Sequence, residues 1–146
     1  MILKYKAFTL LEILLVITIV GILLTVVVRL VRPEDRFADI RNAQRKSDVL
    51  SIYTAINQYR EDNRGQFPPG ITSTSTALCQ PGCVESGTQI DINTDIAQYI
   101  RNGVLPIDPS QTGTVLTGYT ISLDSGGRVI VSASLAENGE VINTQE

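Results

Sequence analysis

The feature that most constrains this sequence is an apolar run near its N-terminus. Residues Phe8 to Val28 contain one charged side chain, Glu12. As a helix rising about 1.5 Å per residue, these 21 residues are long enough to cross a hydrocarbon core of roughly 30 Å. We therefore predict a helix over 8–28 that can span a bilayer, which leaves a small globular part in the rest of the chain.

The residues on either side of this run distinguish a membrane-spanning helix from a secretory signal peptide. Lys4 and Lys6 precede the run, as in a signal peptide. However, the apolar part of a signal peptide is about 7–15 residues long and ends at a small-x-small cleavage site, whereas this run continues through Val28 into Arg29. The two lysines predict a cytoplasmic N-terminus and a head outside the cytoplasm, while Arg29 and Arg32 on the far side oppose that orientation.

Glu12 is the exception within the run. A carboxylate near a bilayer centre costs on the order of 3 kcal/mol, so something should compensate it. Two interpretations stay open: Glu12 lies close enough to the headgroups to reach water, or it meets a positive partner from another chain.

The composition argues against catalysis and nucleic-acid binding. The chain has no histidine, which removes the commonest general base and the commonest metal ligand. Two cysteines cannot form a four-ligand zinc site alone, and 5% aromatic residues without tryptophan leave little for base stacking. There is neither a Gly-x-Ser-x-Gly motif nor a glycine-rich phosphate loop. We expect no enzyme activity, no cofactor, no metal site and no nucleic-acid partner.

Charge is divided along the chain. Residues 29–64 hold eight basic and six acidic side chains, a net +2, and residues 65–146 hold two basic and eight acidic ones, a net −6. A basic stem therefore carries an acidic head, and copies of such a chain can attract one another. Ordinary solvated surfaces are the plainer interpretation of most of these charges.

A second helix is predicted over residues 34–64, where there is neither glycine nor proline. Its second half carries an apolar stripe that should face a core, formed by Val49, Ile52, Ile56 and Tyr59. In its first half the apolar residues are Phe37, Ile40 and Ala43. The helix over 34–64 is predicted to continue the helix over 8–28, so that the two form one long helix from Phe8 to Asn63. Pro33 is predicted to mark a bend in this long helix.

The head is predicted to begin with a loop. Residues 70–92 are rich in threonine, serine, glycine and glutamine, and they include Cys79-Gln-Pro-Gly-Cys83. The Pro-Gly turn brings the two thiols together, and outside the cytoplasm we expect a structural disulfide. A redox-active pair or half of a metal site is the alternative.

The remainder of the head is predicted to be a short helix followed by strands. Residues 94–101 have the pattern of a short helix, and alternation predicts strands at 119–123, 129–135 and 140–144. A three-stranded meander needs cover on its apolar face, and the stripe from Val49 to Tyr59 provides it. The expected fold class is α+β, a long helix packed on a small antiparallel sheet.

The N-terminal residues carry a resemblance to a known family. Lys4 to Leu24 reads Lys-Tyr-Lys-Ala-Phe-Thr-Leu-Leu-Glu-Ile-Leu-Leu-Val-Ile-Thr-Ile-Val-Gly-Ile-Leu-Leu. This resembles the class III signal of type IV pilins and type II secretion pseudopilins. The resemblance implies cleavage between Ala7 and Phe8 by a prepilin peptidase, N-methylation of Phe8, and Glu12 as the fifth mature residue. Ala7 stands where the family usually has glycine, and Arg29 where many members have proline.

Two further segments are similar to the family. Asp62, Asn63, Phe67 and Pro68 correspond to an Asp-Asn-x-x-Tyr-Pro signature at the end of the helix, with one residue more before the aromatic. Leu105-Pro106-Ile107-Asp108-Pro109 resembles the Leu-Pro-x-Asp-Pro turn of the family's heads. The family's pseudopilins often bind calcium in loops of the C-terminal sheet, and loop oxygen donors are present here (Asp108, Asp124, Glu137 and Asn138). Isolated acidic residues in turns are usually just solvated, and this interpretation is favoured over a calcium site.

The resemblance implies a domain organisation of leader 1–7, transmembrane or filament-core helix 8–28, amphipathic helix 29–64 and head 65–146. It implies a structural subunit of a type IV pilus-like filament, held in the cytoplasmic membrane and then polymerised on the cell surface or in the periplasm. The implied partners are copies of the chain, related pilins, the prepilin peptidase, the membrane and assembly-platform proteins. A type II secretion pseudopilin is the near alternative, and a membrane-anchored periplasmic enzyme or binding module is the alternative of another class.

Overall fold

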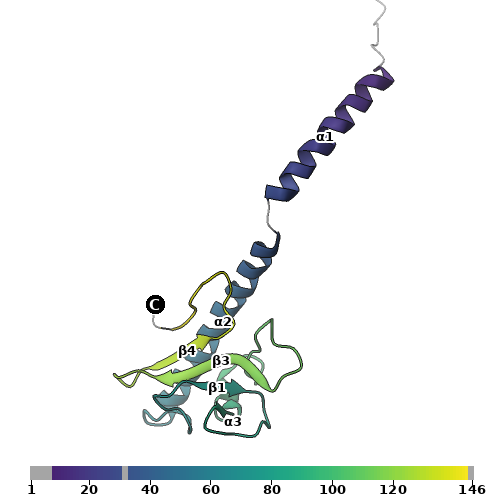
Figure 1. Ribbon diagram of the computed structural model, residues 1–146. Helices are drawn as coiled ribbons and strands as arrows, with labels where there is room; N and C mark the ends of the chain where they lie inside the picture. Colours follow the sequence, from purple (N-terminus) through teal and green to yellow (C-terminus); the bar gives the residue numbers. More distant parts are fainter. Residues whose placement is uncertain (1–7, 31–32, 145–146) are drawn as a thin grey trace, which may run out of the picture. The chain divides into compact units, whose positions relative to one another are not determined.

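The computed structural model describes residues 8–30 and 33–144, and they divide into two units with the boundary between Arg36 and Phe37. Each unit is described by itself. The first contains helix α1, Leu10–Leu30 (Figure 1). The other elements are α2 Pro33–Asp62, β1 Thr76–Cys79, β2 Gln89–Ile90, α3 Asn93–Ile96, the 3-10 helix η1 Ala97–Tyr99, β3 Leu116–Leu123 and β4 Val129–Ala133.

Helix α2 confirms the helix predicted over 34–64. Proline suits the first position of a helix because its missing N–H has no partner there, and acidic residues follow in the first turn. The helix ends where Arg64 and Gly65 take positive φ values of 57° and 86°, and the Gly65 amide donates to the Arg60 carbonyl at 2.7 Å. Residues 31–32 lie outside the described residues, and with them the predicted continuity from Phe8 to Asn63.

The sheet has four strands in the order β2-β1-β3-β4. Strands β3 and β4 form the predicted hairpin, with Tyr119 opposite Ala133 and Leu123 opposite Val129. β1 pairs antiparallel with β3 but parallel with β2, so the sheet is mixed, where a purely antiparallel sheet was expected.

Two expectations about the strands need correction. Residues 70–92 were predicted to be loop, but they hold β1 and β2, whose four and two residues are too short for alternation to be recognised. Residues 140–144 do not form a regular third strand of the meander. They run beside the outer edge of β4 as an isolated bridge between Asn143 and Ser132, with backbone hydrogen bonds from Ala133 to the Ile142 carbonyl and from Thr144 to the Val131 carbonyl, at 3.0 and 3.1 Å.

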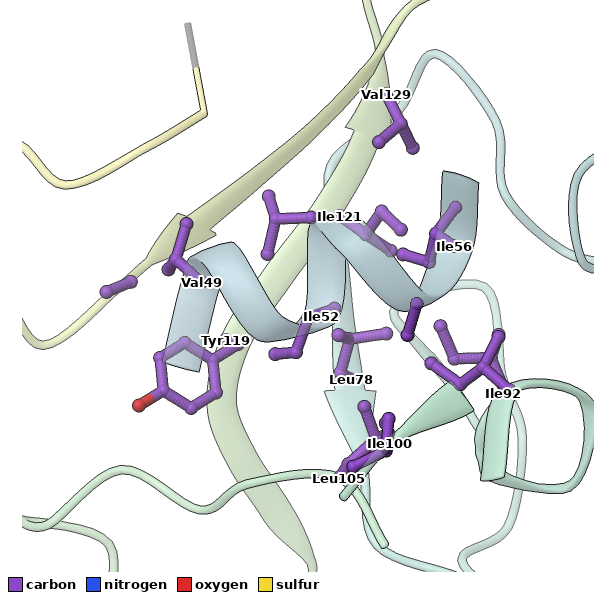
Figure 2. Close-up of a cluster of buried hydrophobic side chains, with 14 of the residues drawn as sticks. Val49, Ile52, Ile56, Leu78, Ile92, Ile100, Leu105, Tyr119, Ile121 and Val129 are labelled. Carbon is purple, nitrogen blue, oxygen red and sulfur yellow. The ribbon is translucent and has the colours of Figure 1, made fainter. Parts of the chain in front are cut away.

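The core lies between α2 and the sheet, as the apolar stripe predicted. Val49, Ile52 and Ile56 are buried against side chains of the strands and of residues 90–105, and Tyr59 packs on the same cluster with part of its surface exposed. Figure 2 shows α2 crossing the strands with Ile52, Tyr119 and Ile121 between them. The α+β fold of a long helix on a small sheet is thus confirmed.

Candidate functional site

Helix α1 presents its apolar side chains on every side. None of its residues is buried within the chain, and its length of 21 residues and its mean hydropathy of 2.9 over an 18-residue window make it the one candidate membrane span among residues 8–30 and 33–144. A helix that is apolar all round needs a nonpolar environment from outside, either lipid or other protein.

The polar groups of α1 are satisfied within the helix. The Thr9 carbonyl accepts from the amides of Glu12 and Ile13, and Thr9 Oγ1 accepts a second contact from the Glu12 amide at 3.2 Å. The hydroxyls of Thr18 and Thr25 donate to carbonyls one turn back, at 2.7–3.1 Å and 2.9 Å. Two charged groups are left on this apolar helix: the Glu12 carboxylate in its first turn and the Arg29 guanidinium in its last turn.

Of the two predicted processing residues, the structure describes only Phe8. Ala7 lies outside the described residues. Phe8 is 74% exposed and precedes the helix, which begins at Leu10 after the Thr9 cap. Phe8 is therefore outside the helical geometry that would set it one turn from Glu12 on a shared face.

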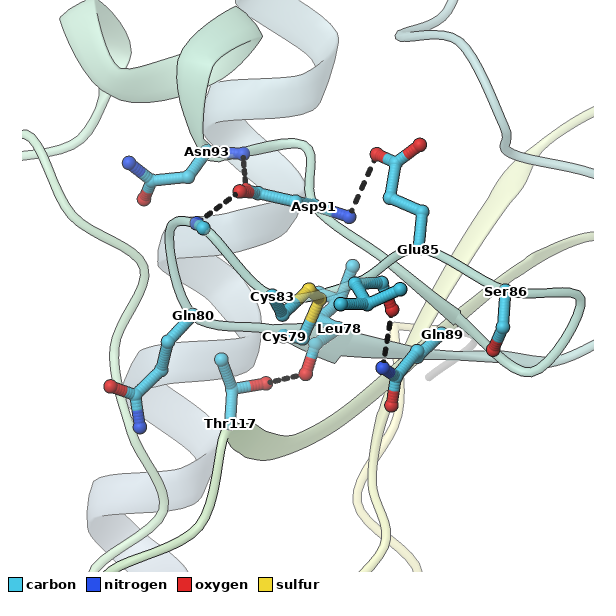
Figure 3. Close-up of a disulfide and its surroundings, with 12 residues drawn as sticks. Leu78, Cys79, Gln80, Cys83, Glu85, Ser86, Gln89, Asp91, Asn93 and Thr117 are labelled. Atoms are coloured by element: carbon cyan, nitrogen blue, oxygen red, sulfur yellow. Dashed lines mark hydrogen bonds between the residues drawn. A yellow bond between two sulfur atoms is a disulfide. The ribbon is translucent and has the colours of Figure 1, made fainter.

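Cys79 and Cys83 form a disulfide, with their Cα atoms 6.2 Å apart. The bond closes the turn after β1 (Figure 3), and the Cys83 amide donates to the Gln80 carbonyl at 3.2 Å within that turn. Because both cysteines are in the disulfide, neither is a free thiol.

The head also contains a buried ion cluster that the sequence analysis did not predict. Arg45 on α2 and Asp108 in the 105–109 turn have side chains with no exposed surface. Arg45 Nε donates to Asp108 Oδ2 at 2.6 Å, and Arg45 Nη2 donates to Asp108 Oδ1 at 3.0 Å. This two-point geometry is the strong form of a guanidinium–carboxylate contact. Arg45 Nη1 donates to Asn42 Oδ1, and Nη2 also donates to Ser110 Oγ, both at 2.8 Å.

A second carboxylate, Glu137, joins the cluster from the C-terminal loop. Arg41 Nε donates to Glu137 Oε1 at 2.7 Å, Arg41 Nη2 also contacts Oε2, and Arg45 Nη2 lies 3.2 Å from Oε1. The side-chain amide of Asn42 makes two hydrogen bonds to the backbone of Glu137. Its Nδ2 donates to the Glu137 carbonyl at 2.9 Å, and its Oδ1 accepts from the Glu137 N–H at 3.0 Å. The hydrogen bond from Arg41, followed by that from Arg45, lowers the pKa of Glu137 to about 2. Ion pairs and hydrogen bonds therefore connect α2 to two loops far away in the sequence, the 105–109 turn and the C-terminal loop.

Asp48 and Tyr119 make a further buried contact between α2 and β3. The Tyr119 hydroxyl donates to Asp48 Oδ2 at 2.7 Å, and Gln44 donates to Asp48 Oδ1 at 2.8 Å. Burial raises the pKa of Asp48. Burial, followed by the hydrogen bond to Asp48, raises the pKa of Tyr119. Every buried side-chain polar atom among the described residues has a hydrogen-bond partner.

Three of the four loop residues considered as calcium ligands are bound by cations of the chain itself, and the fourth, Asn138, contacts a carboxylate. Asp108 and Glu137 bind the arginines of α2, Asp124 pairs with Arg128, and Asn138 donates to Asp39 at 3.0 Å. Within the described residues no group of three or more acidic, cysteine or histidine side chains is arranged to hold a metal ion.

The comparisons with known proteins concern the N-terminal segment. A family model described as the prokaryotic N-terminal methylation motif matches residues 2–28. The chain carries the prepilin-type cleavage and methylation motif of type IV pilins and pseudopilins. Proteins of that group are structural subunits, and the motif implies processing by prepilin peptidase. Comparisons with curated proteins and with solved structures found no match.

Proposed function

We propose that this chain is a structural subunit of a type IV pilus-like filament. It is held in the cytoplasmic membrane by α1 with its head outside the cytoplasm, and it then polymerises through α1. The observation that carries the proposal is a fully exposed apolar helix, led by a prepilin motif and attached to a folded head. Lipid covers this helix before assembly, and α1 helices of other copies and of related pilins cover it afterwards.

Processing gives Glu12 a partner. Cleavage after Ala7 leaves a free amine on Phe8, and a carboxylate in a nonpolar filament core is costly unless it is paired. Because Phe8 precedes the helix, geometry favours pairing between subunits over pairing along one helical face. A subunit added in the wrong register leaves both charges unpaired, so Glu12 acts as a register check.

A single repeating contact between unlike surfaces is sufficient for such a polymer, because a head-to-tail contact that does not close produces an open helix. The head disulfide agrees with a location outside the cytoplasm, where disulfides persist.

The test is to express the full chain in a bacterium with a prepilin peptidase and an assembly platform, and to shear the cells. We expect filaments in electron micrographs, and a subunit whose N-terminus by mass spectrometry is methylated Phe8. An intact Met1 in assembled material contradicts the proposal. Processed protein found only in the membrane and periplasm, together with a secretion defect on deletion, identifies a secretion pseudopilin instead.

A further inference from the structure

The head carries a shallow groove beside α2. It has a volume of about 410 Å³ and lies between the outer face of α2 and the segment after α3. Its other side is formed by Tyr99 and Arg101, and its α2 side by Ser47, Leu50, Ser51, Thr54 and Gln58. Leu50 is 62% exposed there. Leu50 therefore gives the groove an exposed apolar side chain among the hydroxyl groups of α2.

Arg101 is the one charged side chain in this groove. It forms no ion pair in the part of the chain that the structure describes, whereas the other cation of residues 65–146, Arg128, is paired with Asp124. Every buried polar atom of the described residues is already satisfied, so no orphaned group points to a small polar ligand. The groove therefore fits a protein segment that brings an apolar side chain and an acid together.

The same head displays such a segment elsewhere. Val84 is 82% exposed, and the adjacent Glu85 is exposed and forms no ion pair among the described residues. Neither residue lines the groove. Nearby Asp95 has a raised pKa, caused by burial and then by the negative charges of Asp91 and Glu85. Glu85 thus lies near two further acidic side chains, those of Asp91 and Asp95.

The segment is held in place, as Figure 3 shows. The Cys79–Cys83 disulfide ends one residue before Val84, and Gln89 Nε2 donates to the Val84 carbonyl at 2.6 Å. Glu85 Oε1 accepts from the Asp91 amide at 3.3 Å. A fixed exposed loop loses little conformational freedom on binding.

We propose that Val84 and Glu85 of one copy dock in the Ser47–Arg101 groove of a neighbouring copy, with Glu85 paired to Arg101 and Val84 on Leu50. The occupant is a second copy because this chain's own head supplies the complementary charge and apolar side chain. The two surfaces differ, so the contact is heterologous and repeats without closing, as a filament requires. The inference rests on the proposed function and gives it a contact between heads.

The test is a charge exchange in the full chain, measured as the yield of sheared filaments. Glu85→Arg and Arg101→Glu each place like charges in contact, and we expect each to lower the yield about tenfold. The double variant restores the pair and should recover most of the yield. Arg64→Glu, a charge reversal at an exposed cation outside the groove, is the matched control and should assemble normally.

A second measurement does not depend on yield. In filaments of the Arg101→Lys variant, a zero-length carbodiimide reagent should join the introduced amine to the Glu85 carboxylate of a neighbouring copy and produce a ladder of multimers on a denaturing gel. Normal filaments without this cross-linked peptide, or single charge reversals that assemble like wild type, overturn the inference. The absence of wild-type filaments overturns the proposed function instead, so the two failures are distinguishable.

Discussion

At the scale of single residues, the helix face that enters the core includes charged positions. Asn42 and Arg45 lie on the face of α2 that continues into Val49, Ile52 and Ile56, at helical spacing. Arg45 was not predicted because an arginine on a charged helix is usually solvated. The signal that could have found it was its place on the apolar stripe, together with the buried Asp-Pro turn that supplies its partner.

Arg45→Met should be strongly destabilising, because it leaves the Asp108 carboxylate buried without its cation. Losing one partner of a buried pair costs about 3–5 kcal/mol. The measurement is chemical unfolding of the purified protein in detergent. Arg36→Met, at an exposed cation of the same helix, should change the free energy of unfolding by no more than about 0.5 kcal/mol. Equal effects of the two substitutions would show that the cluster does not stabilise the head.

Glu137 predicts a pH dependence. Its pKa is lowered to about 2 from the usual 4.5, chiefly by Arg41, so the ionised form stabilises the fold. That stability is fully present above about pH 4.5 and is lost as the pH falls through about 2. Glu137→Gln should therefore lower the free energy of unfolding at pH 7 and have almost no effect at pH 2. Glu61→Gln, at an exposed carboxylate, is the control, and a Glu137→Gln effect of equal size at both pH values would contradict the linkage.

Glu12→Gln separates the two interpretations of the acid in α1. Removing the charge makes the helix more apolar, so the variant should still insert in the membrane and be cleaved. It should enter filaments poorly, because the Phe8 amine then has no carboxylate partner. Membrane fractionation and the yield of sheared filaments measure the two steps. If the variant polymerises as well as wild type, Glu12 is a residue near the headgroups that tolerates water.

At the scale of elements, the periodicity of apolar residues predicted the long helix and the long strands but missed the two short strands. Helix α2 and the β3–β4 hairpin have enough residues for an apolar pattern to be read, and both were found. β1 spans only Thr76 to Cys79, and it is stabilised as a strand by pairing with β3, which lies about forty residues later in the sequence. Such long-range pairing is not encoded in a local pattern. The parallel partner β2 was missed for the same reason.

The disulfide predicts a modest stabilisation of this part of the sheet. A loop closed by so few residues is worth about 2 kcal/mol in the chain-entropy model. The Cys79→Ala, Cys83→Ala double variant should lose about that amount in denaturant unfolding, and reduction of the wild type should give a similar loss. Thiol titration of the oxidised protein, native and denatured, should find no free cysteine. Titratable thiols in denatured, oxidised protein would show that the bond is absent.

At the scale of the whole molecule, the chain divides its apolar residues between two tasks. The described residues of α1 contribute nothing to the core, whereas the buried apolar residues run from Ala38 to Ile142 within residues 37–146. The fold of the head therefore does not depend on the segment that carries the methylation motif. This separation is what a subunit needs if its helix moves from lipid to a filament core while its head stays folded.

Removing residues 1–36 should accordingly leave a soluble, folded head. The deletion takes away the first turn of α2, but it leaves the ion cluster of Arg41, Arg45, Asp108 and Glu137 and the whole apolar core. Its melting temperature in buffer should lie within about 4 °C of the full chain in detergent, the shift that about 1 kcal/mol produces in a domain of this size. The deleted chain should not form filaments, since the only exposed apolar helix among the described residues is gone. A fragment that is unfolded, or that melts far below the full chain, would mean that the N-terminal helix supports the head, and the separation of tasks would then be wrong.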